Sequence, residues 1–193
     1  MTTRSEQTRT RLQACALELF ATHGYDATTV EQIAAAAGVS HMTFFRHFPT
    51  KESAIVADPY DPLMAEGVRA QPRELPALER VRRGIRAAWA AAPMPIDDET
   101  RARVAIMSGH EKLRAKAWEN TLETERVIVE ALESTGVPRL EAVVAAGACV
   151  GAVMAALFDW GTSTDAGPLG ERLLAALDLL ESVHGVPPPV AAS

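Results

Sequence analysis

The sequence of 193 residues has few cysteines and few aromatic residues, and the apolar run between Glu141 and Asp159 has only 17 residues, which favours burial between protein surfaces over a membrane span. Its two cysteines, Cys15 and Cys149, have no second cysteine or histidine at metal-ligand spacing, so we predict no disulfide, no metal site and no cofactor. No stretch of about 18 or more uncharged apolar residues is present, and the N-terminal residues lack the apolar centre of a signal peptide. We therefore expect a cytoplasmic protein without a membrane span.

Residue sets for catalysis are also missing from the sequence. No nucleophile, base and orienting carboxylate stand out together, and His23 and His110 lie at predicted helix ends, where capping or solvent contact is the simpler role. No strand pattern appears, so no glycine-rich phosphate loop follows a strand. The sequence therefore predicts an all-α protein that is not an enzyme.

The composition allows a sizeable core but gives the chain a net charge of -6, which by itself argues against binding nucleic acid. The chain has 19 basic and 25 acidic residues, and residues 1 to 57 contain five of each. The remaining residues therefore contain 14 basic and 20 acidic side chains, so all of the acidic excess lies beyond residue 57. A neutral N-terminal segment can still contact a duplex through a few phosphates.

Residues 28 to 51, TTVEQIAAAAGVSHMTFFRHFPTK, contain two short helical patterns that meet at Gly38. Thr28 and Glu31 have the spacing of a capping box, which predicts a helix to about residue 36. Gly38 suits the left-handed residue that ends a helix, and Ser40 is a good N-cap for the next one. This layout is typical of a helix-turn-helix, whose second helix enters the major groove of DNA.

The second of these helices is predicted over about residues 40 to 48, with Phe44 and Phe48 facing inward. Its outer face presents groups that can bond base edges or contact thymine methyls: His41, Met42, Thr43, Phe45, Arg46 and His47. An earlier helix, over about residues 5 to 22, ends at Gly24. Arg4, Arg9 and Arg11 lie near its start, where they either face an outside anion or form a solvated basic turn.

Residues 27 to 55, ATTVEQIAAAAGVSHMTFFRHFPTKESAI, resemble the DNA-binding segment of the TetR family of bacterial repressors in helix lengths, the A-G-V turn, the aromatic pair and the trailing Lys-Glu. The resemblance implies base-edge contacts by His41, Met42, Thr43 and Arg46. It also implies phosphate contacts by Thr28, Phe45, His47 and Lys51. Phe45 stands where the family most often has Tyr, so this position lacks the hydroxyl that bonds a phosphate.

Thr50 is the N-cap of a fourth predicted helix, which runs to about Val56. Beyond residue 57 the pattern predicts five more helices, for about nine in all, over residues 76–91, 99–108, 111–134, 140–160 and 169–183. Asp58-Pro59 and Asp61-Pro62 interrupt the link, which either ends near Ala57 or resumes at Leu63. We expect a helix-turn-helix domain in residues 1–57, an effector-binding and dimerisation domain in residues 58–186, and a disordered tail in residues 187–193.

The resemblance also implies a ligand pocket and a dimer interface in this second domain. Core packing is the alternative for each pocket residue taken singly, but the group suits an apolar cavity: Trp89, Met94, Ile96, Val104, Met107, Leu113, Trp118, Leu122, Met154 and Phe158. The last two helices resemble the family's dimer-forming pair, with Gly147, Gly151, Leu173, Leu177 and Leu180 at the interface. Residues 101 to 122 loosely resemble the actinobacterial branch that binds acyl-CoA-like molecules.

The sequence thus predicts a homodimeric, ligand-responsive repressor that binds double-stranded DNA and is released by a small apolar effector. An α-helical enzyme or carrier with a vestigial helix-turn-helix is the alternative, and duplex binding with sequence preference would exclude it. A membrane-surface protein is a third possibility, which the acidic second domain opposes.

Overall fold

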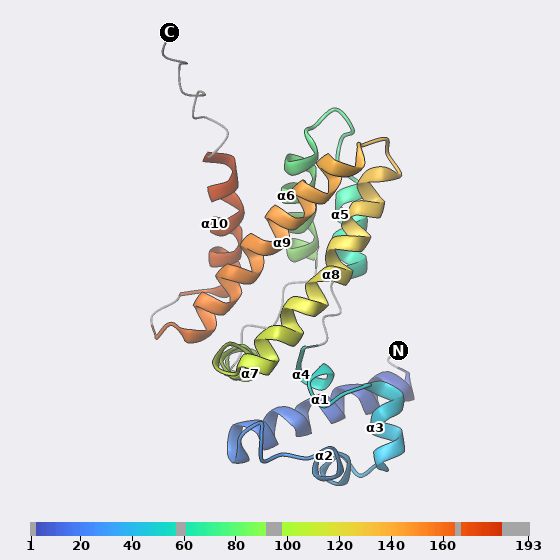
Figure 1. Cartoon of the computed structure of the whole chain (residues 1–193), viewed down its shortest axis with the longest axis vertical. Helices are drawn as coiled ribbons and strands as arrows, with labels where there is room; N and C mark the ends of the chain where they lie inside the picture. Colours follow the sequence, from blue (N-terminus) through green and yellow to red (C-terminus); the bar gives the residue numbers. More distant parts are fainter. Residues whose placement is uncertain (1–2, 57–60, 92–97, 165–166, 183–193) are drawn as a thin grey trace. The chain divides into compact units, whose positions relative to one another are not determined.

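The computed structural model describes residues 3–56, 61–91, 98–164 and 167–182, and these residues form ten α-helices and no strand (Figure 1). The all-α prediction is confirmed. The helix that the sequence did not resolve is α5 (Asp61–Arg69), so the link resumes as a helix after the first proline pair. The predicted tail in residues 187–193 lies outside the described residues.

Two compact units make up the chain. The first contains residues 1–58 and 96–120, and the second contains residues 59–95 and 121–193. The first unit therefore includes α7 (Asp98–Gly109) and the start of α8 (Glu111–Glu133) in addition to the N-terminal helices. The assignment of DNA binding to residues 1–57 and of effector binding to residues 58–186 stays a prediction, because compactness does not show what either segment binds.

The first three helices of the first unit are α1 (Arg4–His23), α2 (Val30–Ala36) and α3 (His41–His47). Helix α1 ends at Gly24, whose φ of 83° only glycine adopts readily. Gly38 has a φ of 64° at the turn between α2 and α3, and the side chain of Ser40 caps α3 by accepting from the Thr43 N–H. These predictions from local sequence are confirmed.

The predicted capping box of α2 is wrong by one residue. Thr29 is the N-cap, and it exchanges the paired hydrogen bonds with Gln32 rather than Thr28 with Glu31. The Thr28 hydroxyl instead donates to the carbonyl oxygens of Leu19 and Gly24, at 3.3 and 2.8 Å. These bonds bury Thr28 in the loop between α1 and α2, so its side chain is not available to cap a helix.

A small apolar core holds these helices together. Phe44 and Phe48 are fully buried, and the short helix α4 (Ser53–Val56) packs against α1. The core of the three helices is completed by Leu12, Ala16, Phe20, Ile33, Ala34 and Ala37. With one side of α3 anchored in this way, the opposite side of the same helix is left facing solvent.

The second unit packs α5 and α6 (Ala77–Ala91) with the rest of α8, α9 (Arg139–Thr162) and α10 (Leu169–Ser182). Helices α5 and α6 meet backbone to backbone, because a Cβ added to Gly67 would lie 2.4 Å from the carbonyl oxygen of Gly84. Any side chain at either glycine would push the two helices apart. The shared core extends across α5, α6, α8, α9 and α10.

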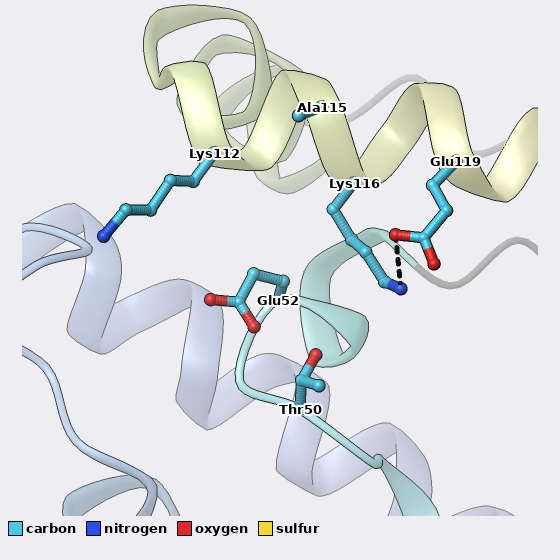
Figure 2. A pocket seen from close by; sticks show the side chains of 6 residues that line it. All are labelled: Thr50, Glu52, Lys112, Ala115, Lys116 and Glu119. Atoms are coloured by element: carbon cyan, nitrogen blue, oxygen red, sulfur yellow. Dashed lines mark ion pairs between the residues drawn. The ribbon is translucent and has the colours of Figure 1, made fainter.

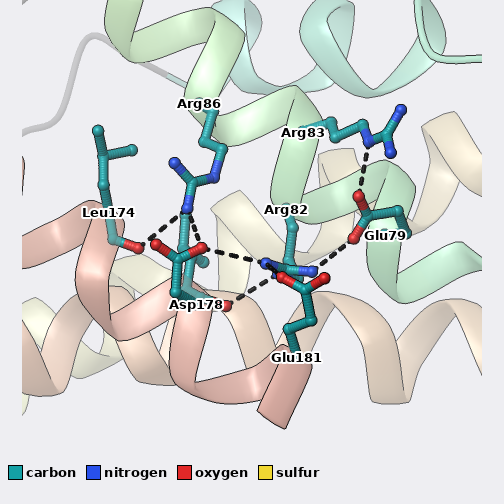
Figure 3. Close-up of polar contacts among 8 residues, drawn as sticks. Glu79, Arg82, Arg83, Arg86, Leu174, Asp178 and Glu181 are labelled. Atoms are coloured by element: carbon teal, nitrogen blue, oxygen red, sulfur yellow. Dashed lines mark hydrogen bonds and ion pairs between the residues drawn. The ribbon is translucent and has the colours of Figure 1, made fainter. Parts of the chain in front are cut away.

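Ionic contacts join α6 to α10 (Figure 3). Arg82 donates to Glu181 at 2.8 Å and to the carbonyl oxygen of Leu177 at 2.8 Å, and it also pairs with Glu79 and Asp178. Burial of Arg82 works against its charge, but these carboxylates outweigh burial and raise the pKa of its guanidinium. The contacts position α10 along α6.

Helix α9 is the one helix among the described residues that is long and apolar enough to cross a membrane, by length and composition alone. Only 28% of its most apolar 18-residue window is buried within the chain. One side, which includes Ala142, Ala146 and Cys149, belongs to the core, whereas Leu140 and Val144 on another side are 77% and 61% exposed. The described residues of the chain therefore leave this side of α9 uncovered.

Candidate nucleic-acid interface and effector region

The outer face of α3 carries the side chains that the sequence predicted for base contacts. His41, Met42 and Arg46 are exposed, with Met42 at 67%, and Thr43 is half-buried. The Thr43 hydroxyl lies 3.0 Å from the Ser40 hydroxyl, so the N-cap also orients this side chain. The structure thus brings the four residues together on the exposed side of one helix.

Phe45 and His47 are the two α3 residues predicted to contact the DNA backbone. Phe45 is exposed and lies edge-on to His41 and Phe44. Burial, together with the nearby charges of Arg46 and Arg9, lowers the pKa of His47. This shift favours the neutral form of His47 in the free chain, and a neutral ring can still offer a phosphate an N–H.

Arg9 takes a place that the sequence did not predict. Its guanidinium donates to the carbonyl oxygen of His47 at 3.0 Å and lies 4.5 Å from the centre of the Phe48 ring. This bond satisfies one of the carbonyls left open at the end of α3. Arg9 therefore fastens α1 to α3, a role that a separation of 38 residues hides from any local pattern.

Thr28 and Lys51, the other two predicted phosphate contacts, are both engaged within the first unit. Thr28 is 1% exposed. The Lys51 ammonium donates to the carbonyl oxygens of Tyr25 and Thr28, at 2.7 and 2.9 Å, and lies 4.0 Å from the centre of the Tyr25 ring. In this structure Lys51 closes the loop between α1 and α2.

A cluster of polar side chains surrounds Tyr25 in the first unit. The Tyr25 hydroxyl donates to Glu52, and the Tyr25 ring lies 4.3 Å from that of His110. His110 Nε2 in turn lies 3.1 Å from the Asp26 carboxylate. His110 stands between α7 and α8, so the cluster connects that corner to the loop between α1 and α2.

Burial and hydrogen bonding shift the titrations in this cluster. Burial, then the hydrogen bond and charge of Glu52, raises the pKa of Tyr25 well above its usual range. Burial would also raise the pKa of Glu52, but hydrogen bonds from Tyr25 and from the backbone outweigh it and hold that pKa below its ordinary value. The bond shared with His110 lowers the pKa of Asp26. Both carboxylates are therefore ionised at pH 7.

A surface pocket of about 420 Å³ lies in the first unit (Figure 2). It is open and lined by both signs of charge, and Lys116 pairs with Glu119 at 2.9 Å along one wall. The lining residues are Thr50, Glu52, Lys112, Ala115, Lys116 and Glu119. None of them was predicted as a ligand contact, and their polarity suits water and ions better than an apolar molecule.

The residues predicted to line an effector pocket are divided between the two units. Val104, Met107 and Leu113 are buried in the first unit, where Trp118 is exposed. The second unit contains exposed Leu122 and half-buried Trp89, Met154 and Phe158. Met94 and Ile96 lie outside the described residues. The prediction that these residues share one cavity stays a prediction.

The residues predicted for the dimer interface have two different environments. Gly147 and Gly151 are half-buried, and a Cβ added to either would meet nothing within 4 Å. Leu173 and Leu177 are instead buried inside the second unit, with Leu177 at 0% exposure, and Leu180 is half-buried. The apolar spacing of these leucines does not tell whether their own chain or a second copy of it covers them.

Comparison with known sequences assigns both parts of the chain. Residues 14–56 match the family described as "Bacterial regulatory proteins, tetR family", and residues 75–185 match the "MftR C-terminal domain". The transcriptional regulator TcmR of Streptomyces glaucescens is 59% identical over 46 residues, which are 24% of this chain. This match spans only 20% of the length of TcmR.

Solved structures agree with this assignment at the level of the fold. SmeT, the repressor of the Stenotrophomonas maltophilia multidrug efflux pump SmeDEF, is 19% identical with a TM-score of 0.58, over 98% of this chain and 97% of SmeT. Thermus thermophilus FadR, solved with lauroyl-CoA, is 22% identical with a TM-score of 0.51, over 96% of this chain and 99% of FadR. Because the MftR-type match alone covers more than half of the sequence, the chain belongs to the TetR family of bacterial transcriptional regulators.

Proposed function

We propose that the protein is a homodimeric repressor that reads a pseudo-palindromic operator with α3 and is released from it by a small apolar effector. The observation that supports this most directly is the outer face of α3. There His41, Met42, Thr43 and Arg46 stand exposed or half-exposed on a helix that Phe44 and Phe48 fix from behind. Such a surface serves base edges better than it serves water.

Phe45 and His47 would contact the sugar-phosphate backbone beside these base contacts. Neither brings a full positive charge, and the segment of residues 1–57 is neutral. Affinity would therefore depend less on bulk charge and more on the fit of α3 to one sequence. Thr28 and Lys51 would act by holding the loop between α1 and α2 in place.

A second copy of the chain would cover the exposed side of α9. Leu140, Val144, Gly147 and Gly151 follow each other at intervals of four, three and four residues, which is the spacing of a helix-helix seam. The two glycines leave open space in which a partner helix can approach closely. A membrane-spanning role fits less well, because the opposite side of α9 is built into the core of its own unit.

This dimer arrangement can be tested by the oligomeric state in analytical ultracentrifugation. Val144→Glu places a charge in the seam and is expected to give monomers. Leu63→Glu, on an exposed position of α5, is the matched control and should sediment like the parent. If Val144→Glu remained dimeric, the seam would lie elsewhere. In the dimer, two copies of α3 would meet half-sites about 34 Å apart.

The effector is expected to be apolar. Two relatives with the same fold were solved with molecules that contain a large apolar part, FadR with lauroyl-CoA, whose acyl chain is apolar, and SmeT with triclosan. Such an effector would bind better to the conformer that does not bind DNA, and it would therefore lower the affinity for the operator. By reciprocity, operator DNA lowers the affinity for the effector by the same factor. A coupling of about 1 to 3 kcal/mol would be ordinary.

The Tyr25 cluster offers a route for this coupling within the first unit. His110 stands where α7 meets α8 and touches both Asp26 and Tyr25 in the loop before α2. A shift of that corner would be passed to α2 and α3 through these contacts. The protein would act in the cytoplasm by binding, and not as an enzyme.

A footprint of the purified protein on the DNA immediately upstream of its own gene tests the proposal. We expect one protected palindromic site that is lost when a fatty acyl compound is added. A uniform, salt-sensitive retention of all DNA sequences would contradict operator recognition. Turnover of a ligand without preference for any DNA sequence would instead favour the enzyme or carrier alternative.

A further inference from the structure

Arg80 is an arginine that the structure leaves buried without a partner. It lies at the end of the first turn of α6 and is 0% exposed. None of its three side-chain nitrogens has a hydrogen-bond partner in the part of the chain that the structure describes. A guanidinium stays protonated in proteins and has five N–H donors to satisfy, so a site of this kind calls for an explanation.

The neighbouring arginines of α6 show what a paired guanidinium looks like in this unit. Arg82 is also buried, but it contacts three carboxylates and a carbonyl oxygen. Arg83 donates to Glu79 at 2.6 Å, and Arg86 pairs with Asp178 (Figure 3). Arg80 differs from all three, because no described carboxylate is bonded to it.

The carboxylates in this network are already in use. The three paired arginines of α6 are matched by three carboxylates, those of Glu79, Asp178 and Glu181. Glu141 lies near the start of α6, but its carboxylate accepts from the Ala77 N–H at 3.4 Å and does not reach Arg80. Among the described residues of the second unit, the buried guanidinium of Arg80 therefore has no hydrogen-bonded carboxylate.

The surroundings of Arg80 along α6 are apolar. Ala77 and Val81 belong to the core, and Gly84, one turn on, contacts the backbone of α5. These residues supply no side-chain oxygen that could accept from the guanidinium. A charge so placed is stabilised only when an anion joins it, since desolvation disfavours an isolated ion.

We propose that Arg80 is the anchor for the carboxylate of an amphiphilic effector whose apolar remainder lies among core side chains of the second unit. A carboxylate fits because one guanidinium balances one negative charge and offers two parallel N–H donors to its two oxygens. A phosphate monoester carries nearly two charges and would need a second cation. The proposal rests on the proposed function only in naming the occupant as the effector.

Thermal unfolding of the whole protein with matched ligands tests this assignment. Decanoate and decan-1-ol share a chain and differ in the carboxylate. We expect decanoate to raise the unfolding midpoint of the parent more than decan-1-ol does. In Arg80→Met this difference should vanish, with the affinity for decanoate lower by on the order of 10- to 100-fold, as for a lost charged hydrogen bond.

Two controls separate anion binding from a structural role of the arginine. Arg83→Met removes an exposed α6 arginine and should keep the preference for decanoate. Without ligand, Arg80→Met should unfold in urea at the same or a higher concentration than the parent, because an apolar side chain replaces an unpaired buried charge. A merely structural arginine would give the opposite result.

Four outcomes of the unfolding measurements would overturn the assignment. One is that no carboxylate from hexanoate to hexadecanoate protects the parent better than the alcohol of equal length. The second is that Arg80→Met keeps the preference, and the third is that Arg80→Met without ligand is less stable than the parent. The fourth is that inorganic phosphate protects the parent as strongly as decanoate does and does not protect Arg80→Met. Arg80 would then bind oxyanions in general and not a carboxylate in particular.

Operator binding measured in the same samples distinguishes this proposal from the proposed function. If decanoate stabilised the parent through Arg80 but left operator affinity unchanged, the anion site would be supported and its occupant would not be the effector. Equal release of the operator by decanoate and decan-1-ol would support the effector function and overturn the role of Arg80.

Discussion

Replacing Lys51 by Met distinguishes two roles of this side chain. The family resemblance implies a phosphate contact, whereas the structure has the ammonium bonded to the carbonyl oxygens of Tyr25 and Thr28. A hydrogen bond from a charged donor contributes about 1.5 to 3 kcal/mol, and a partly exposed cation over an aromatic ring contributes about 0.5 to 1 kcal/mol. Because Lys51 is only half-buried, we expect Lys51→Met to destabilise the first unit by roughly 2 to 4 kcal/mol.

Urea unfolding followed by circular dichroism measures this loss. With a slope of about 2 kcal/mol per molar urea, the midpoint should fall by roughly 1 to 2 M. Lys112→Met, which removes an exposed lysine of α8, is the control and should leave the midpoint unchanged. Under conditions where Lys51→Met is folded, the salt dependence of operator binding should match that of the parent.

The opposite pair of results would refute this reasoning. If Lys51→Met had the same urea midpoint as the parent, the two hydrogen bonds of the Lys51 ammonium would contribute nothing to stability. If the slope of log affinity against log salt also fell by about two units, one for each subunit of a dimer, Lys51 would be shown to leave the carbonyls for phosphates on the operator.

Three further groups of measurements address individual side chains. Thr43→Ala should relax base preference at one operator position by about 1 kcal/mol, and Phe45→Tyr should tighten binding to all sequences several-fold by adding a phosphate-bonding hydroxyl, both measured by fluorescence anisotropy. Because the pKa of Glu52 is lowered in the folded protein, the carboxylate contributes its full stability above the ordinary pKa of 4.5, and this contribution is lost as the pH falls through the folded pKa. The urea midpoint of Glu52→Gln should therefore fall less between pH 6 and pH 3 than that of the parent. Burial raises the pKa of Cys149 to about 12, so in a Cys15→Ser background a thiol reagent at pH 8 should react with Cys149 only as fast as the protein unfolds.

The helices of the DNA-binding segment could be predicted closely because their signals are local. A positive-φ glycine, an N-cap serine and two phenylalanines four residues apart act within one or two turns, and each has its predicted role in the structure. The helices beyond residue 76 also begin and end within two residues of the prediction. For these helices, the apolar periodicity and the Gly and Pro breaks were sufficient to predict where each helix begins and ends.

The capping of α2 shows where local signals become ambiguous. Thr28 and Thr29 are both followed three residues later by a side chain that can complete a capping box. The choice between them depends on the carbonyl oxygens of Leu19 and Gly24, which only the folded loop brings to the Thr28 hydroxyl. A one-residue shift was therefore beyond the reach of the pattern.

By itself, the sequence determined the all-α fold, the helix-turn-helix and which face of α3 is outward, because helical periodicity states which side of each helix is apolar. Tertiary structure alone decided which polar groups meet. The bond of Arg9 to the end of α3, the contact of Tyr25 with His110 and the isolation of Arg80 all join or separate residues far apart in the chain. The spacing of residues along a helix does not reveal such pairings, because an arginine or lysine can occupy the same position whichever group it contacts.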